Sequence, residues 1–137
     1  KKKLLTGIGI LIAVTAIVFL TIELIPAKID CGESEIYNVE EIEAAANLVA
    51  DYINALEGCK LFAVVYDGDA VSQNNLDYCN SLAKDEKNYK DCIVFTSYFR
   101  SPIRGGGAWN ANSLYSWSWY LARTEGGEWE ELTHGYA

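Results

Sequence analysis

The feature that most constrains this chain is a run of nineteen residues without a charged side chain, Leu4–Ile22. A helix rises about 1.5 Å per residue, so the run spans roughly 28 Å, close to the thickness of a bilayer's hydrocarbon core. Three lysines, Lys1–Lys3, precede the run, and Glu23 and Pro26 follow it. These features predict a transmembrane anchor over residues 1–26.

The charges on either side of the run predict its orientation. Lysines before it and acidic residues after it follow the positive-inside rule, so we expect a single-pass protein of the cell membrane with its C-terminal part outside the cytoplasm. A cleaved signal peptide is the main alternative, but its apolar core usually has about 7–15 residues. A lipoprotein anchor would need small residues before Cys31, where the chain has Lys28-Ile29-Asp30.

The residues after the anchor carry a strongly acidic balance. From Lys28 onward there are eight Lys and Arg against eighteen Asp and Glu, a net charge of −10. Nucleic acids and anionic lipids both need basic patches, so this balance disfavours both as partners of the domain. About 110 residues suffice for one domain with one modest core. We expect that domain over residues 38–137, after a linker over residues 27–37.

Four cysteines fall on the expected outer side: Cys31, Cys59, Cys79 and Cys92. An even number in an oxidising compartment favours disulfides, with three possible connectivities. A helix between Cys31 and Cys59 would separate these two by about 30 Å, so we favour a Cys79–Cys92 disulfide. Zinc is the alternative, but the chain has no CxxC pair and one histidine. We therefore expect no metal site and no cofactor.

The clearest helix of the domain is expected over Asn38–Glu57. Its first residue is a good N-cap, Glu41 completes a capping box, and Gly58 is placed to end the helix. Apolar residues recur with helical spacing on one face: Ile42, Ala45, Val49, Tyr52, Ile53 and Leu56. A second helix, capped by Ser72, is expected to reach about Lys84.

Four segments rich in β-branched and aromatic residues predict strands: Lys60–Tyr66, Cys92–Arg100, Ser113–Arg123 and Glu128–Thr133. Glu125-Gly126-Gly127 predicts a hairpin turn between the last two. The order helix, strand, helix and three strands predicts an α+β domain. In this fold, a curved, mainly antiparallel sheet of about four strands wraps on the first helix of the domain.

Several segments carry a resemblance to a known family: Cys59–Asp69, Leu76–Ala83, Asp91–Pro102, Gly105–Asn112 and Tyr115–Ala137. Together they resemble an uncharacterised extracytoplasmic domain common among Gram-positive bacterial membrane proteins. The closing strand–turn–strand, with Trp129 soon after Gly-Gly, also resembles the nuclear-transport-factor-like and cystatin-like sheets of many bacterial lipoproteins. The resemblance implies a helix packed on a curved sheet, and it implies no activity.

The sharpest functional candidate is a set of aromatic residues: Trp109, Tyr115, Trp117, Trp119 and Tyr120. Exposed aromatic rings stack on sugars and on peptides, and the ligand-binding side of such sheets is concave. For a domain outside a bacterial cell, we expect a cell-wall polymer or another envelope protein as the ligand. The alternative is that the face with Trp117 and Trp119 packs on the first helix of the domain as core.

Catalytic chemistry has weaker support. His134 is the only histidine, and no serine lies in a GxSxG elbow. Paired acids such as Asp67 and Asp69, or Glu130 and Glu131, are typical of solvated turns and exposed strand faces. Gly105-Gly106-Gly107 lies between two strands, whereas a phosphate-binding loop is followed by a helix, so we expect a flexible connection there. The sequence predicts a non-enzymatic binding or sensing module; a pilin-like structural subunit and a small hydrolase are the alternatives.

Overall fold

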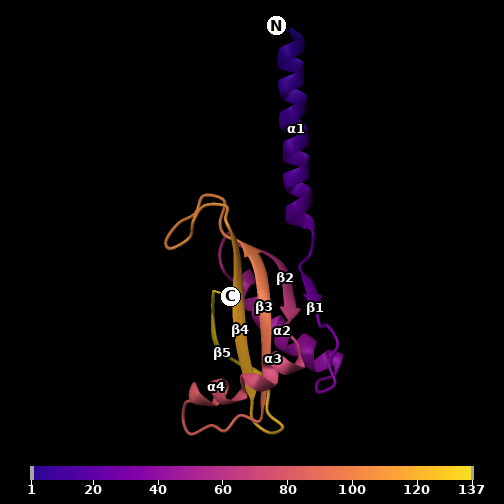
Figure 1. Cartoon of the computed structure of the whole chain (residues 1–137). Coiled ribbons are helices and arrows are strands. Elements are labelled where there is room, and N and C mark those ends of the chain that lie inside the picture. The colour runs from indigo at the N-terminus through magenta and orange to yellow at the C-terminus, as the bar shows by residue number, and fades with distance from the viewer. Residues whose placement is uncertain (1, 137) are drawn as a thin grey trace.

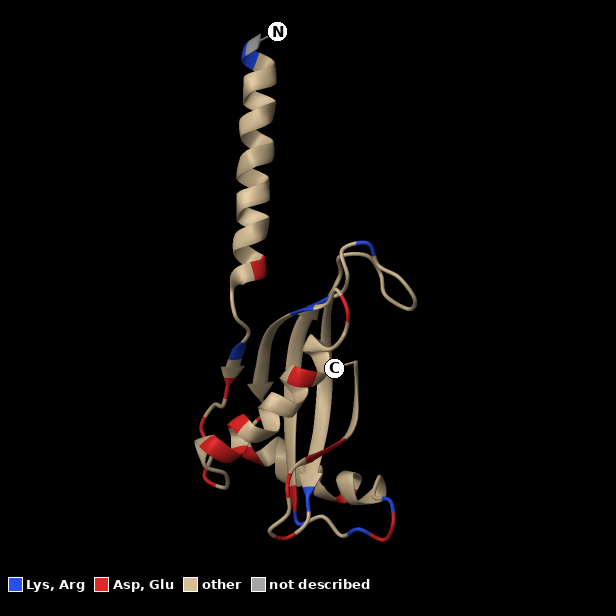
Figure 2. Ribbon diagram, turned by 180° about the vertical axis from the view of Figure 1, so that it is seen from behind, with Lys and Arg blue, Asp and Glu red and all other residues tan. Residues whose placement is uncertain are grey.

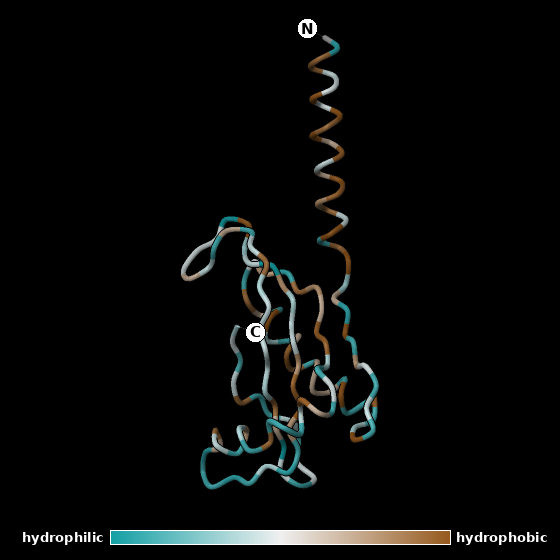
Figure 3. Tube along the Cα trace, viewed as in Figure 1, coloured by the Kyte–Doolittle hydropathy of each residue, from teal (hydrophilic) through white to brown (hydrophobic). Residues whose placement is uncertain are grey.

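The computed structural model describes residues 2–136 and shows an apolar helix standing away from one α+β domain (Figure 1). This helix, α1, spans Lys2–Leu24 and is long and apolar enough to cross a membrane. It is the longest hydrophobic stretch of the chain trace (Figure 3). The hydroxyls of Thr15 and Thr21 each donate to the carbonyl one turn earlier, which satisfies them without water. The helix is compatible with a single membrane span, as the sequence predicts.

An open sheet of five strands forms the centre of the domain. The other elements are β1 Lys28–Asp30, α2 Val39–Asn54, β2 Lys60–Tyr66, α3 Asp69–Asn74, α4 Leu76–Ser81, β3 Asp91–Arg100, β4 Leu114–Arg123 and β5 Glu130–Tyr136. The strands lie in the order β1-β2-β3-β4-β5; β1 pairs with β2 in parallel, and the remaining neighbours are antiparallel. The α+β class is confirmed, but the sheet is mixed and has one strand more than expected.

The extra strand, β1, corrects the prediction of a plain linker over residues 27–37. Ile29 pairs with β2 and packs partly against the core. A three-residue edge strand is too short for alternation to reveal it in the sequence. Further along, Ser34 Oγ and the Glu35 backbone N–H donate to the Asp69 carboxylate at 2.6 and 2.8 Å. This segment is therefore fastened to the domain.

Helix α2 starts where its capping signals place it but ends earlier than expected. The Glu41 N–H donates to the Asn38 side chain, and the Asn38 N–H donates to the Glu41 carboxylate, which completes the predicted capping box. The helix ends at Asn54 rather than at Glu57, and Gly58 follows in a turn with φ +76°. Because of this early end, α2 covers only part of the sheet face on which it lies.

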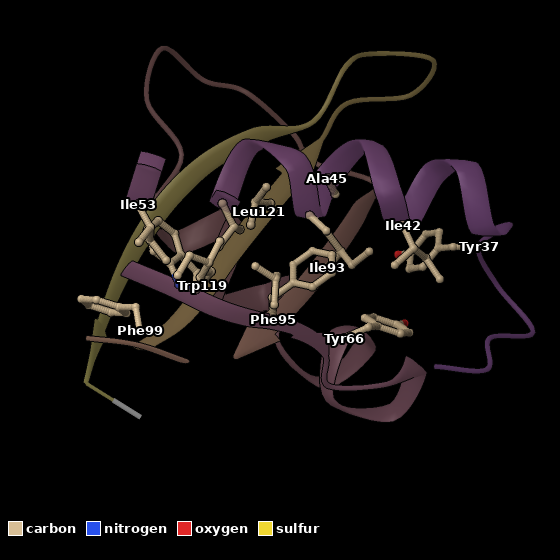
Figure 4. Packing of buried hydrophobic residues seen from close by; sticks show 14 residues of the cluster. Tyr37, Ile42, Ala45, Ile53, Tyr66, Ile93, Phe95, Phe99, Trp119 and Leu121 are labelled. Atoms are coloured by element: carbon tan, nitrogen blue, oxygen red, sulfur yellow. The ribbon is translucent and has the colours of Figure 1, made fainter. Parts of the chain in front are cut away.

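Helix α2 packs its apolar side on one face of the sheet and forms the main core with it (Figure 4). Residues from both layers fill this core, among them Ile42, Ala45, Ile53, Ile93, Phe95 and Leu121. Trp119 is its largest fully buried side chain, and the Trp119 Nε1 donates to Ser97 Oγ at 2.8 Å. The polar group of this tryptophan is therefore paired inside a dry core.

Two short helices, α3 and α4, contact the opposite face, where a single helix was expected. They are separated at Asn75. Ser72, which was expected to cap the helix, is instead buried within α3, where its Oγ accepts a hydrogen bond from the Val94 N–H at 3.2 Å. A second cluster forms there from Cys79, Tyr89, Cys92, Val94 and Ala122.

Helix α1 meets the domain where β2 begins and β3 ends. Arg100, which is almost fully buried, forms an ion pair with Glu23, with 2.7 Å between Nη2 and Oε1. The Lys60 ammonium donates to the carbonyls of Glu23 and Ile25 at 2.7 and 2.8 Å, where α1 ends. We call this end of the sheet the anchor end and the opposite end the far end.

Candidate binding surface

The five aromatic residues predicted as a site do not form one surface. Successive side chains of a strand point to opposite faces. On β4, Tyr115, Trp117 and Trp119 lie on the α2 side, whereas Tyr120 packs against the second cluster on the other side. Trp119 is fully buried, so it belongs to the core, which was the alternative prediction for this face. Trp109, Tyr115 and Trp117 remain half-buried on the same side as α2.

The loop between β3 and β4 folds Trp109 back onto this face. The Trp109 ring stacks on Trp117 with centroids 5.7 Å apart, and it meets Phe99 and Tyr115 edge-on at 5.9 and 5.1 Å. Gly105 permits this path, because its φ is +68° and a Cβ there would lie 2.9 Å from the Trp109 carbonyl oxygen. The loop that was predicted to be a flexible connection therefore packs onto the sheet through Trp109.

Strand β5 adds two residues that the sequence analysis did not include. A register shift next to Tyr120 in the β4–β5 pairing places His134 opposite Trp119 and Tyr136 opposite Trp117. The His134 ring stacks on Trp117 and Trp119, with centroids 4.9 and 4.4 Å apart. Simple alternation along β5 would not reveal this arrangement, because a bulge changes which residues face the helix.

Six residues together form what we call the aromatic surface: Tyr52, Trp109, Tyr115, Trp117, His134 and Tyr136. Tyr52 joins from the last turns of α2, with its ring centroid 4.7 Å from that of His134. The Tyr136 ring lies 6.0 Å from Tyr115 and is 78% exposed. The rings are thus continuous from the end of α2 to the loop at the anchor end.

The aromatic surface begins where α2 ends. The first turn of α2 lies at the far end, because Glu41 pairs there with Arg123, the last residue of β4. The last turns of α2 reach only to the middle of β4, where Tyr52 contacts Trp119 at 5.2 Å. The rest of β4 continues toward the anchor end without the helix above it, and there Trp117 and Tyr115 are partly open to solvent.

An unpaired hydrogen-bond donor lies within the aromatic surface. The Trp117 Nε1 is out of contact with solvent and has no hydrogen-bonding partner in the described part of the chain. His134 differs, because its Nδ1 lies 3.0 Å from Glu131 Oε1. An aromatic surface with a half-buried imidazole can stack on a flat apolar ring and hydrogen-bond to its polar edge.

The acidic residues considered for catalysis have structural partners. Burial raises the pKa of Asp67, although the Thr96 hydroxyl donates to its carboxylate at 3.0 Å. Hydrogen bonds from Ser34 and from the Glu35 backbone lower the pKa of Asp69. Within residues 2–136, no group of three or more His, Cys, Asp or Glu is placed to hold a metal ion.

The structure brings together the two cysteines that the sequence analysis paired. The Sγ atoms of Cys79 and Cys92 lie 2.7 Å apart in the second cluster, as thiols rather than as a disulfide. The contact with Cys79, together with burial, raises the pKa of the Cys92 thiol. Cys31 and Cys59 lie near opposite ends of β2, because β1 runs parallel to it, and both are thiols.

Searches against family models, curated proteins and solved structures gave no match to this chain.

Proposed function

We propose that this protein is a membrane-tethered, non-enzymatic binding or sensing module that acts outside the cytoplasm. Its anchor is α1, whose lysines precede the span and whose acidic residue follows it. Its ligand site is the aromatic surface. The ligand that this surface fits best is a saccharide, such as a strand of a cell-wall polymer.

The observation that carries the proposal is that α2 covers only part of its sheet face. A small domain needs its large aromatic residues for core area, and α2 uses Trp119 in this way. Trp109 and Trp117 instead stack side by side beyond the end of α2 and are only half-buried. Exposed, preordered aromatic rings of this kind provide large contact area at low conformational cost.

The chemistry of the surface favours a sugar ring. One face of a sugar ring is formed by C–H groups and stacks on aromatic rings, while its hydroxyls both donate and accept hydrogen bonds. The polar group that a sugar hydroxyl can reach at this surface is the imidazole of His134, which is half-buried and stacks on Trp117.

The proposed location outside the cytoplasm also predicts the oxidation state of the cysteines. An extracytoplasmic compartment is oxidising, and Cys79 and Cys92 lie within 2.7 Å of each other. We therefore expect the protein isolated from such a compartment to contain a Cys79–Cys92 disulfide and two free thiols at Cys31 and Cys59. Mass spectrometry of the non-reduced protein measures this pairing; four free thiols in the native protein would contradict the assigned compartment.

Ligand binding is tested with the full chain in phosphatidylcholine nanodiscs, titrated with soluble glycan fragments of peptidoglycan and followed by tryptophan fluorescence. We expect a saturable change in emission. Tyr136→Ser should weaken binding by about tenfold, because it removes an exposed ring from the edge of the surface.

Tyr98→Ser is the matched control, because Tyr98 is an exposed tyrosine on the opposite face of β3, with 48% of its surface accessible. It should leave the affinity unchanged. Equal losses in the two variants, or an emission that no glycan fragment changes, would contradict a saccharide site on the aromatic surface.

A further inference from the structure

The position of α1 on the domain limits which part of the domain can reach a membrane. The Arg100–Glu23 ion pair and the two hydrogen bonds from Lys60 hold the end of α1 against the anchor end. The Arg100 guanidinium also lies 5.7 Å from the Phe19 ring centroid, one turn further into the helix. A domain held in this way presents its anchor end to the lipid surface that α1 enters.

The loop between β3 and β4, Ser101–Ser113, extends furthest in that direction. In both Figure 1 and Figure 2 it rises from the sheet beside α1, and its apex is level with the last turn of that helix. The last turn contains Glu23, which ends the uncharged run and so marks the boundary of the hydrocarbon core. The apex of the loop therefore lies at the height of the lipid headgroups.

Internal hydrogen bonds give this loop a defined conformation. The Ser101 hydroxyl is buried and lies within hydrogen-bonding distance of the Asn110 and Ser113 carbonyls. The N–H groups of Gly105 and Asn112 both donate to the Pro102 carbonyl at 2.9 Å. Together with the packing of Trp109 on the sheet, these bonds keep the loop upright without any partner.

The side chains at the apex have the chemistry of a membrane interface. Ile103 is a large apolar residue that is 50% exposed. Arg104 follows it, and its guanidinium has no ion-pair or hydrogen-bond partner among residues 2–136. Figure 2 shows a blue segment, the colour of Lys and Arg, at the top of this loop, and Arg104 is the basic residue of the loop sequence. An apolar residue beside an unpaired guanidinium suits the boundary between acyl chains and phosphates.

The charges of the domain are also separated along its length. Lys60, Arg100 and Arg104 lie at the anchor end, where Glu23 and Glu57 are the nearby acids. Most acidic residues lie toward the far end, around the start of α2 and the turns below the sheet (Figure 2). The net charge of −10 disfavours binding of the whole domain to anionic lipid. The negative charge is concentrated away from the membrane, however, and the end that faces the membrane is not strongly acidic.

We infer that the β3–β4 loop is a membrane contact, in which Ile103 enters the interface and Arg104 binds lipid phosphates of an anionic leaflet. This inference rests on the proposed role of α1 as a membrane anchor. The contact would hold the domain at one height and tilt, and it would place the aromatic surface close to the membrane, because Trp109 belongs to both the loop and that surface.

The contact is tested by photocross-linking of the full chain in vesicles. Benzoylphenylalanine is placed in separate variants at Ile103, at Ile12 within α1 and at Val71, an exposed apolar residue of α3. The vesicles contain phosphatidylcholine, with or without phosphatidylglycerol, and lipid adducts are counted by mass spectrometry. We expect adducts at positions 12 and 103 and background levels at position 71.

The outcomes separate the inference from its premise. Adducts at position 12 with only background at position 103 would overturn the loop contact and leave the anchor intact. Background at position 12 would show that α1 is not in the bilayer, which would overturn both.

A second arm tests the arginine. In vesicles with phosphatidylglycerol, Arg104→Gln should lower the adduct yield at position 103 by about fivefold, which corresponds to about 1 kcal/mol for one basic residue at an anionic surface. Lys84→Gln is the matched control, because Lys84 is an exposed lysine in the segment that follows α4. It should leave the yield unchanged. An unchanged yield after Arg104→Gln, or an equal loss in both variants, would overturn the binding of lipid phosphate by Arg104.

Discussion

Two tryptophans on the same face of β4 show how differently the two halves of that face are used. Trp119 lies under α2, is fully buried and has its indole N–H bonded to Ser97. Trp117 lies two residues nearer the anchor end, is half-buried and stacks on Trp109, and its indole N–H has no hydrogen-bond partner within residues 2–136. The residue type and the strand face are the same, so the difference comes from where α2 ends. A helix shorter than its sheet converts core residues into a surface.

The largest expected effect is on stability in the covered half. Trp119→Ala should lower the free energy of unfolding by about 3–5 kcal/mol, because it leaves a large cavity beneath α2. Trp117→Ala should cost less than half as much, since its ring is only partly buried. Urea unfolding followed by circular dichroism measures both; equal losses would show that the two halves are packed alike.

The next effect concerns the hydrogen bond inside the covered half. Ser97→Ala removes the acceptor of the Trp119 indole N–H and leaves that buried donor unpaired, which should cost about 1–3 kcal/mol of unfolding free energy. Ser118→Ala is the control, because Ser118 is a half-buried serine of β4 on the other face. A similar loss in both variants would mean that the bond at Trp119 contributes nothing specific.

A smaller effect should depend on pH. Hydrogen bonds from Arg123 and then from the Asn38 backbone lower the pKa of Glu41 below its ordinary value of 4.5. The charged carboxylate is favoured in the folded state, so its contribution is present above pH 4.5 and is lost as the pH falls through the lowered pKa. Because the pair is partly exposed, we expect Glu41→Gln to cost about 1 kcal/mol or less at neutral pH.

The difference between wild type and Glu41→Gln should vanish on acidification, as measured by urea unfolding between neutral and acidic pH. Glu40→Gln is the control, because Glu40 is the neighbouring acid of the same helical turn and is exposed. A pH-independent difference for Glu41→Gln would show that the ion pair at the far end does not fasten α2 to β4.

The smallest effect is expected at the edge of the aromatic surface. Tyr136→Ser should change the free energy of unfolding by no more than about 0.5 kcal/mol, because the tyrosine is mostly exposed. The same substitution is expected to weaken glycan binding, so the two measurements together distinguish a surface residue from a core residue. A large loss of stability would place Tyr136 in the core instead.

Sequence patterns predicted the main helix and strands because these elements depend on interactions between residues that are close in the sequence. The capping residues Asn38 and Glu41 mark the start of α2, and the apolar, β-branched and aromatic runs mark β2, β3 and β4. The elements that sequence reasoning missed depend on distant partners. β1 exists only as a parallel neighbour of β2, and Ser72 is a buried acceptor for Val94 rather than a cap. Neither partner is visible in a short window of sequence.

The candidate site was predicted only in part for the same reason. Alternation along β4 places Tyr120 on the face opposite Trp117 and Trp119, as the structure does, because alternation depends on one strand. It did not show that α2 stops above Trp119, which decides between core and surface. His134 joins the site through the bulged β4–β5 pairing, and that register depends on two strands.

The most direct test of this account is ¹⁹F NMR of the full chain labelled with 5-fluorotryptophan, recorded with and without a soluble gadolinium chelate. Single Trp→Phe variants assign the signals of Trp109, Trp117 and Trp119. We predict that the chelate broadens the first two signals and leaves that of Trp119 sharp, because only Trp119 lies beneath α2. If the Trp117 signal were as protected as that of Trp119, the aromatic surface would be part of the core, and the proposed binding site would not exist.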